Sequence, residues 1–227
     1  MTRMQVRDPH IGRNQGQLLA FSVVALVVAV GLFLAIAEDV TTRDPLVLLD
    51  ARIATWLHAH ASPGLTKFFL LVTYLHSQAA ICVFAMILAS VLAWQRDWNG
   101  VLRLGLVVPG GLLLNALLKQ VYHRTRPSFD EPLLTLTTFS FPSGHTAGAV
   151  LFYGMLASVI MSRLASRGAR AACVLLAALL VAVVSLSRMY LGVHYLSDVL
   201  AAACASLAWL IFCSVAVHAL RLWRTAR

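Results

Sequence analysis

The sequence predicts an all-α fold: a polytopic membrane helical bundle with six transmembrane helices, plus interfacial amphipathic helices in the first outer loop. The first observation is composition, because 60% of the 227 residues are hydrophobic and only 12% are charged. The mean hydropathy of +0.81 is too apolar for a soluble domain of this length. The second observation is that the apolar residues gather in runs near the ~20 residues that a membrane-crossing helix needs. The third is an uneven distribution of arginine between the two ends of those runs.

The first apolar run covers residues 17–37 and follows a polar segment over residues 1–16. It is long enough to span a hydrocarbon core of about 30 Å. Ala35-Ile36-Ala37 resembles a small-residue cleavage site, so a signal peptide is the competing interpretation. The run is longer than a usual signal core and further spans follow it, so we expect a retained first helix.

Residues 38–76 contain no clean membrane span. Apolar residues recur at helical spacing over 46–57, with Asp50 among them, which predicts an amphipathic helix on the membrane surface. Pro63-Gly64 breaks this helix. Residues 65–75 are apolar but too short to cross, so we expect an interfacial or re-entrant segment there.

Five further runs have lengths suited to crossing the bilayer. The second of them contains Pro109-Gly110-Gly111, which predicts a kink or a close helix contact. We therefore expect one membrane domain over 17–220, with short tails at 1–16 and 221–227. The five runs are about 77–94, 101–118, 145–162, 169–186 and 199–220.

The net charge of +9 would suggest nucleic-acid binding in a soluble protein. With six crossings, however, the side that holds the N-terminus carries eleven arginines and two acidic residues, whereas the opposite side carries seven basic and seven acidic residues. Basic residues mark the cytoplasmic side of an inner membrane, so we expect both termini in the cytoplasm and no nucleic-acid partner. The cysteines lie inside apolar runs without CxxC spacing, so neither a disulfide framework nor a zinc site is predicted. They are Cys82, Cys173, Cys204 and Cys213.

Because successive helices cross the membrane in opposite directions, three polar stretches fall on the outer membrane face. Residues 119–127 follow the third helix, residues 141–145 precede the fourth, and residues 187–198 join the fifth to the sixth. Ionisable groups beside hydrocarbon are costly and usually mark a working site. His194 and Asp198 are four residues apart, so on a helix they share a face, and the carboxylate can accept the proton of one imidazole nitrogen.

The residue types in these stretches suit phosphoryl transfer. The reacting group spreads negative charge over three oxygens, so catalysis consists largely of positioning and electrostatic stabilisation. Lys119, Arg126 and Arg188 offer positive charge. Ser143 can cap the fourth helix, whose exposed N–H groups bind anions, and Gly144 lets the backbone approach a phosphate. Imidazole can attack phosphorus, and a second imidazole can protonate the departing oxygen.

Three motifs carry a resemblance to a known family. Lys-x6-Arg-Pro begins at Lys119, Pro-Ser-Gly-His at Pro142 and Ser-Arg-x5-His-x3-Asp at Ser187. In this order the motifs resemble the type 2 phosphatidic acid phosphatase superfamily, or lipid phosphate phosphatases, which shares its core with vanadium haloperoxidases. The motifs cover residues 119–198, and the six-helix plan extends the likeness to most of the chain.

The resemblance implies a role for each motif residue. His194 is implied to be the nucleophile that forms a phosphohistidine, with Asp198 orienting it. His145 is implied to protonate the leaving oxygen and then to activate water. The residues implied to hold the phosphate oxygens are Lys119, Arg126, Ser143, Gly144 and Arg188. No metal, other cofactor or obligatory protein partner is implied, and the implied partner is a lipid phosphate in the bilayer.

Each motif residue also has a plainer interpretation, as an interfacial anchor, a helix cap or a loop charge. The plainer interpretations require coincidence at every position, so we favour the functional one. His123 and Arg124 lie between motif positions, and there we expect ordinary loop residues. Residues 133–141 are apolar for an outer loop, and we hypothesise that they dip into the outer leaflet and border the substrate entrance.

The sequence therefore predicts a phosphatase of the inner membrane with its active site at the outer surface. The substrates that the resemblance implies are phosphatidic acid, phosphatidylglycerol phosphate, diacylglycerol pyrophosphate and polyprenyl pyrophosphate. A phosphotransferase would use the same motifs and differ in its acceptor, and a haloperoxidase would bind vanadate. A transporter of anionic lipid or phosphate is the alternative from another class, but the sequence shows no pair of interrupted helices in matching halves.

Overall fold

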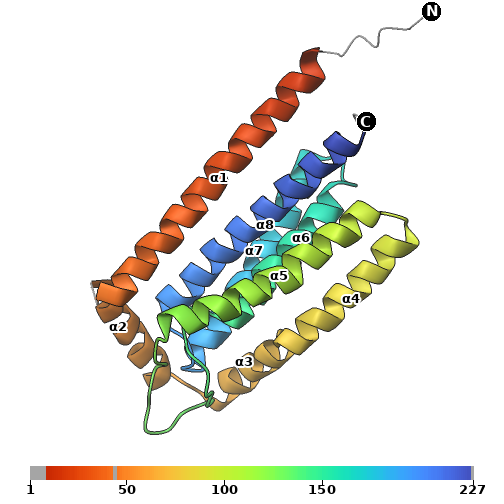
Figure 1. Ribbon diagram of the computed structural model, residues 1–227. Helices are drawn as coiled ribbons and strands as arrows, with labels where there is room; N and C mark the ends of the chain where they lie inside the picture. The colour runs from red at the N-terminus through yellow and green to blue at the C-terminus, as the bar shows by residue number, and fades with distance from the viewer. Residues whose placement is uncertain (1–8, 43–44, 226–227) are drawn as a thin grey trace, which may run out of the picture.

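The computed structural model describes residues 9–42 and 45–225, and every regular element within them is a helix (Figure 1). Residues 1–8, 43–44 and 226–227 lie outside the described part of the chain. Part of the polar segment 1–16 and some of the charges counted on each side of the membrane fall in these ranges. The helices are α1 Pro9–Thr42, α2 Pro45–Ala59, α3 Pro63–Leu75, α4 Gln78–Trp94, α5 Trp98–Tyr122, α6 Gly144–Met161, α7 Arg167–Tyr190 and α8 Leu196–Thr225.

The expected multi-pass helical fold is confirmed. In the described part of the chain, α1, α5, α6, α7 and α8 are each long and apolar enough to cross a membrane. Helices α3 and α4 pass the same test only together, as a pair that bends by 49°, so the described residues contain five candidate crossings, or six if the bent pair is one span. The bend falls at His76-Ser77, where the Ser77 hydroxyl accepts a hydrogen bond from the Ala80 N–H at 3.2 Å and caps α4.

Helix α6 lies at the centre of the bundle and packs against α4, α5, α7 and α8 (Figure 1). Of the residues in α6, 56% are buried, the largest share among the candidate spans in the described part of the chain. Small residues permit this position, since a Cβ atom at Gly154 would lie 2.6 Å from the Leu210 side chain on α8. Close approach of backbones at small residues is how membrane helices gain van der Waals contact without a hydrophobic driving force.

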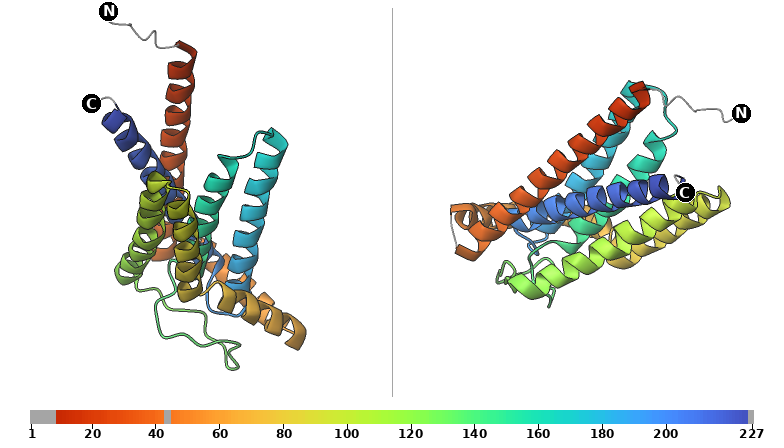
Figure 2. Two further views of the ribbon diagram at one scale, coloured as in Figure 1. Left: turned by 90° about the vertical axis from the view of Figure 1, so that its right-hand side faces the viewer. Right: turned by 45° about the horizontal axis from the view of Figure 1, so that its top comes forward.

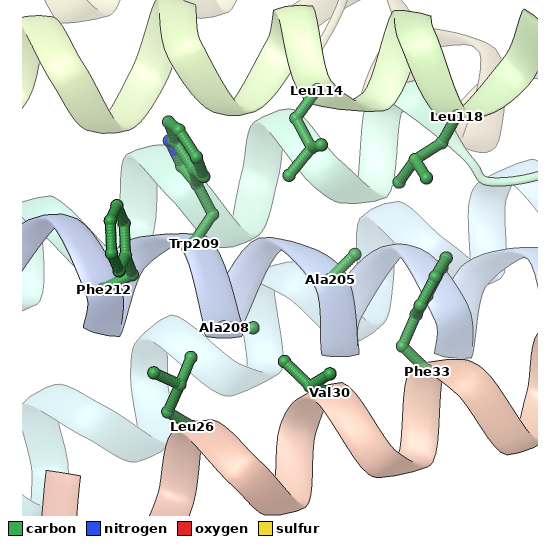
Figure 3. A pocket seen from close by; sticks show the side chains of 9 residues that line it. All are labelled: Leu26, Val30, Phe33, Leu114, Leu118, Ala205, Ala208, Trp209 and Phe212. Carbon is green, nitrogen blue, oxygen red and sulfur yellow. The ribbon is translucent and has the colours of Figure 1, made fainter. Parts of the chain in front are cut away.

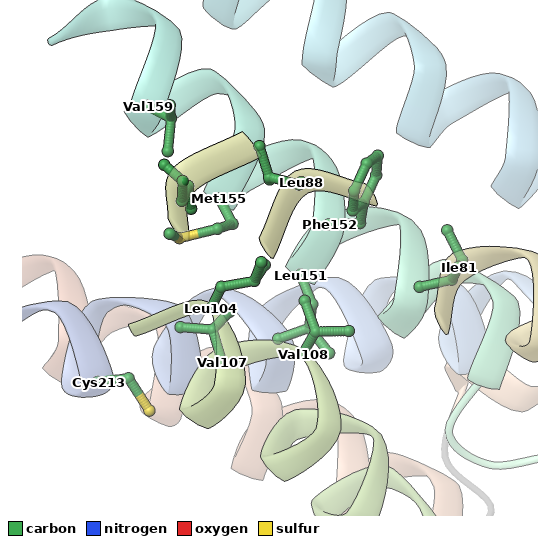
Figure 4. Packing of buried hydrophobic residues seen from close by; sticks show 11 residues of the cluster. Ile81, Leu88, Leu104, Val107, Val108, Leu151, Phe152, Met155, Val159 and Cys213 are labelled. Atoms are coloured by element: carbon green, nitrogen blue, oxygen red, sulfur yellow. The ribbon is translucent and has the colours of Figure 1, made fainter. Parts of the chain in front are cut away.

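The main apolar core lies where α4, α5, α6 and α8 meet (Figure 4). Ile81, Val107, Leu151 and Met155 are fully buried there. The Pro109-Gly110-Gly111 triplet lies in the same region, and α5 runs through it as one continuous helix. The triplet is therefore a site of close helix contact.

Trp209 of α8 lies directly against that triplet. A Cβ atom at Gly110 would lie 2.9 Å from the Trp209 ring, and one at Gly111 would lie 2.6 Å from the Leu151 side chain. The Trp209 indole N–H donates to the Leu106 carbonyl at 3.1 Å. Glycine is thus required at Gly110, because the neighbour is a rigid ring that cannot rotate away without losing its hydrogen bond.

Helix α1 packs on the outside of the bundle against α8. An apolar groove of about 360 Å³ lies among α1, α5 and α8. It runs from Trp209 and Phe212 to Phe33 and Leu118 (Figure 3). Side chains along α1 such as Phe21 remain exposed, as expected of a helix that faces lipid.

The two ends of the bundle differ in content. The N-terminal end of α1 and the C-terminal end of α8 lie at the same end (Figures 1 and 2). Helices α2 and α3, the loop between α5 and α6, and the turn between α7 and α8 gather at the opposite end. The three motif stretches therefore share one end of the molecule, as the alternating direction of the predicted helices requires.

Candidate active site

The C-terminus of α7 fixes the position of His194. Gly192 has φ +69°, a left-handed conformation that costs glycine nothing. The Gly192 N–H donates to the Met189 carbonyl at 3.0 Å, and the Val193 N–H donates to the Arg188 carbonyl at 3.2 Å. This pair of bonds is a Schellman motif, which ends the helix sharply. His194 follows at once, between the ends of α7 and α8.

His194 and Asp198 form the pair that their spacing predicts. His194 Nδ1 lies 3.2 Å from Asp198 Oδ2, and both side chains are buried. Arg126 Nη1 lies 3.1 Å from the other imidazole nitrogen, Nε2. A guanidinium can only donate hydrogen bonds, so Nε2 accepts and carries its lone pair while Nδ1–H donates to Asp198. His194 is thus held as the tautomer in which Nε2 carries the lone pair and Nδ1 carries the hydrogen.

The surroundings of His194 keep its ring neutral. Burial lowers the pKa of His194 well below its usual value, and the nearby charges of Arg126, Arg188 and Lys119 lower it further. A neutral imidazole has the free lone pair that attack on phosphorus requires. The three cations therefore favour an anionic ligand, and they also favour the deprotonated form of the His194 imidazole.

Arg188 is a buried charge whose hydrogen bonds are incomplete. Its side chain is 1% exposed, and its Nη1 donates to the Thr73 hydroxyl of α3. Its Nε and Nη2 have no hydrogen-bond partner among the residues that the structure describes. A buried guanidinium with two unpaired donors is unfavourable unless an anion occupies the adjoining space. The geometry at Arg188 therefore fits a bound oxyanion.

Lys119 and Arg126 are both held by the loop between α5 and α6. Lys119 Nζ donates to the Phe139 carbonyl at 2.6 Å and to the Ser140 carbonyl at 3.3 Å. Arg126 Nε donates to the Thr138 carbonyl at 2.7 Å. Lys119 also interacts electrostatically with Arg126 and Arg188. The loop thus gathers two cations beside the third, which mutual repulsion would otherwise separate.

Ser143, Gly144 and His145 form the start of α6. The Ser143 hydroxyl accepts from the Thr146 N–H at 3.5 Å, which confirms the expected helix cap. The Ser143 N–H donates to the Asp198 carbonyl at 3.0 Å and so ties this helix start to the start of α8. His145 interacts electrostatically with Arg188, His194 and Arg126. All eight predicted residues therefore lie in one region, contributed by α5, α6, α7, α8 and the loops that join them.

Sequence reasoning missed Arg124. We expected an ordinary loop residue, but Arg124 bridges two buried carboxylates, at 2.8 Å from Asp50 and 2.7 Å from Asp198. Its guanidinium also stacks over the Tyr195 ring at 4.3 Å. Burial acts to lower the pKa of Arg124, but Asp198 and Asp50 outweigh burial and raise it. Arg124 therefore stays charged and supports the carboxylate that orients His194.

Asp50 is the second missed residue. It lies on α2, where we expected a helix on the membrane surface, yet its side chain is fully buried. It accepts a hydrogen bond from the Ser197 N–H at 2.9 Å and another from the Ser197 hydroxyl. A single acid within an amphipathic pattern is a weak signal, and its partners lie far away in the sequence, so no local pattern reveals it.

The loop before α6 lies partly inside the protein. Phe141 is fully buried, and its ring packs against Phe33 of α1 and Tyr122 of α5. Leu133 and Leu134 pack against the cluster around Tyr190. Contact of residues 133–141 with the outer leaflet stays a prediction.

Among the residues that the structure describes, no group of three or more His, Cys, Asp and Glu side chains is arranged to hold a metal ion.

Known proteins resemble this chain in sequence and in structure. The model of the PAP2 superfamily matches residues 100–222. Phosphatidylglycerophosphatase B of Bacillus subtilis (strain 168) is 35% identical over 140 residues, which are 61% of this chain and 68% of the relative.

Two solved structures resemble most of the chain. A transmembrane PAP2-type phosphatidylglycerolphosphate phosphatase from Bacillus subtilis superposes with a TM-score of 0.76 and 28% identity, over 84% of this chain and 94% of that one. LpxE of Aquifex aeolicus superposes with a TM-score of 0.60 and 25% identity, over 74% and 95% of the two chains.

Proposed function

The chain belongs to the PAP2 superfamily and is a membrane lipid phosphatase, and from this premise we propose that it hydrolyses a lipid phosphate or lipid pyrophosphate through a phosphohistidine at His194. Phosphatidylglycerol phosphate is the leading candidate substrate, since the similar Bacillus subtilis sequence and the similar Bacillus subtilis structure are both named for that lipid. Phosphatidic acid and polyprenyl pyrophosphate are the other candidates. The proposed reaction needs no metal, other cofactor or obligatory protein partner.

The observation that carries the proposal is the buried guanidinium of Arg188, two of whose donors find no partner in the described part of the chain. A phosphate monoester offers the oxygens that these donors need, and a planar guanidinium fork suits them. The Nε2 lone pair of His194 lies in the same cluster of charges. The site thus combines an anion-binding group with a neutral nucleophile.

The proposed reaction proceeds in two steps. His194 Nε2 attacks phosphorus and the N–P bond forms. The bond from phosphorus to the alcohol oxygen breaks as His145, in the imidazolium form that the bound phosphate anion favours, gives that oxygen a proton. His145 then takes a proton from water, whose oxygen attacks phosphorus and breaks the N–P bond. Lys119, Arg126 and Arg188 hold the phosphate oxygens throughout, and such positioned charge is the largest single contribution to this kind of catalysis.

A panel of lipid phosphates presented to purified protein in EDTA tests the proposal. We expect inorganic phosphate release from at least one lipid with no acceptor added, which also separates a hydrolase from a phosphotransferase. Arg188→Gln should lower kcat/KM about 100-fold or more, since it removes a charged donor. Arg170→Gln, at the opposite end of the bundle, is the matched control and should stay near wild type. Full activity of His194→Ala would contradict the nucleophile assignment.

The proposal includes a direction in the membrane. Both termini are proposed to lie in the cytoplasm, with the active site at the outer face, because the bundle end opposite the site carries the excess of arginine. At that depth the site meets lipid headgroups.

A further inference from the structure

A second cavity adjoins the candidate phosphate site. Its volume is about 430 Å³, within the range of small-molecule pockets. It lies between the C-terminal end of α5, the start of α4 and the loop before α6, and Lys119 lines it. Thr138 and Phe139, whose carbonyls hold Arg126 and Lys119, form its opposite wall. The cavity therefore reaches Lys119, one of the three cations assigned to phosphate.

Two carboxamides reach from this cavity to the phosphate-binding turn. A Cβ atom at Gly144 would lie 3.0 Å from Gln78 Nε2 and 3.4 Å from Asn115 Oδ1. Gly144 belongs to the Ser-Gly-His turn at the start of α6, where a phosphate is expected. If a phosphate is bound at this turn and the rest of the substrate extends into the cavity, the atoms next to the phosphate meet these two amides first.

Asn115 has an acceptor that nothing in the described structure satisfies. Its side chain is 4% exposed, and its Oδ1 has no hydrogen-bond partner among the described residues. Its Nδ2 faces the Pro142 carbonyl at 3.5 Å, which fixes the orientation of the amide, since a carbonyl cannot face Oδ1 favourably. A buried acceptor of this kind needs a donor, and an O–H group supplies one.

The candidate substrates differ in whether they carry an O–H donor near the phosphate. The glycerol that carries the phosphate in phosphatidylglycerol phosphate has a free hydroxyl on the neighbouring carbon. Phosphatidic acid has only ester oxygens there, which accept and do not donate, and a polyprenyl chain has neither. Among the described residues no acidic side chain lines the cavity, so it offers no counter-charge to a cationic amine.

We propose that Asn115 and Gln78 form a subsite for the hydroxyl-bearing alcohol of the substrate, so that the enzyme prefers the phosphate monoester of a polyol headgroup. This inference rests on the proposed function and names the substrate feature that the site reads. Asn115 Oδ1 accepts the hydroxyl hydrogen, and the Gln78 amide donates to the hydroxyl oxygen. A site built to pair a substrate hydroxyl rejects an analogue that lacks it, because its buried acceptor, here Asn115 Oδ1, is then left unpaired.

The test compares two substrates that differ in one atom. They are phosphatidylglycerol phosphate and the same lipid with the headgroup hydroxyl replaced by hydrogen, in identical mixed micelles. Wild type should favour the hydroxyl substrate in kcat/KM by about tenfold or more. Asn115→Leu and Gln78→Leu should each lower kcat/KM for the hydroxyl substrate toward that for the deoxy lipid, and leave the deoxy lipid nearly unchanged. Gln95→Leu, at the far end of α4, is the matched carboxamide control.

Three results overturn the inference or its premise separately. Equal rates of wild type on the two lipids, or an equal loss on both lipids in Asn115→Leu and Gln78→Leu, would overturn the subsite. Phosphate release from neither lipid, nor from any other lipid phosphate, would overturn the proposed function instead. If Asn115→Leu fails to fold, Gln78→Leu decides the outcome, since Gln78 is exposed and tolerates substitution.

Discussion

At the scale of single residues, the site is a balance of charges around one neutral imidazole. Asp198 fixes the His194 tautomer, Arg124 holds Asp198, and Asp50 holds Arg124. On the other side of the ring, Arg126 faces Nε2. This order predicts that residues outside the motifs act on the reaction by positioning the groups inside them.

The Asp50–Arg124 pair gives the first prediction. Asp50→Asn and Arg124→Gln should each lower kcat more than they raise KM, because they loosen Asp198 without touching the phosphate. Breaking a buried pair leaves a partner charge uncompensated, so each variant should also lower Tm. The double variant should cost less than the sum of the two single effects. Arg52→Gln, exposed on the same helix, is the control and should match wild type. Additive losses would show that the pair does not act as a unit.

The pH dependence of the reaction gives the second prediction. Burial and the cations lower the pKa of His194, so the neutral nucleophile persists as pH falls below the usual imidazole range. Arg126→Gln removes one positive charge, which makes protonation of His194 less unfavourable and raises its pKa. The acid limb of kcat/KM should therefore move to higher pH in this variant, whatever the loss in rate. A limb that stays in place or moves to lower pH would contradict this electrostatic role of Arg126.

At the scale of elements, close contacts of helices hold the site. Helix α6 carries Ser143 and His145 at its start and packs along its length against four other helices. The first turn of α8 contains the Asp198 carbonyl that receives the Ser143 N–H. The contact of α8 with α5 at Gly110 lies deeper in the bundle and fixes how these ends meet.

Two glycines of α5 give the third prediction. Gly110→Ala places a methyl group against the Trp209 ring and should lower Tm in detergent by roughly 3–10 °C, from an overpacking cost of about 1–3 kcal/mol. At Gly105, on the same helix, a Cβ atom would meet nothing within 4 Å, so Gly105→Ala should keep or raise Tm. Equal Tm values for the two variants would show that the contact with Trp209 is not tight.

Local patterns in the sequence predict the elements better than the links between them. Apolar runs identify the spans, and the motif residues Lys119, Arg126 and Arg188 are recognisable by their order. The Asp50–Arg124 bond joins residues 74 apart, and no pattern encodes such a distance. Likewise, the apolar loop residue Phe141 looks lipid-facing in the sequence, whereas in the fold it fills a space between α1 and α5. Both the Asp50–Arg124 bond and the burial of Phe141 result from tertiary packing between segments that are distant in the sequence.

At the scale of the whole molecule, the candidate site lies at one end of the bundle, and the N-terminal end of α1 and the C-terminal end of α8 lie at the other (Figure 1). Counted over the whole sequence, the arginine excess is predicted on the side of this second end. For an enzyme whose substrate is a membrane lipid, the proposed orientation places the cations of the site at headgroup depth and the apolar helix faces in the hydrocarbon.

Reporter fusions test this orientation and give the fourth prediction. Alkaline phosphatase fused after Glu131, in the loop beside the site, should be active, because that loop is proposed to lie outside the cytoplasm. The same reporter fused after Ser166, in the turn between α6 and α7, should be inactive, and a fluorescent protein fused to the C-terminus should fluoresce. The reverse pattern would invert the proposed topology and place the site on the cytoplasmic side.

The proposed mechanism depends on covalent capture of phosphate by His194. Rapid quenching of the enzyme with a radiolabelled lipid phosphate, followed by peptide mapping, measures that capture directly. We expect an acid-labile, base-stable label on His194 of wild type and no label in His194→Ala. Turnover by wild type with no labelled histidine, or a label on another residue, would contradict the proposed mechanism.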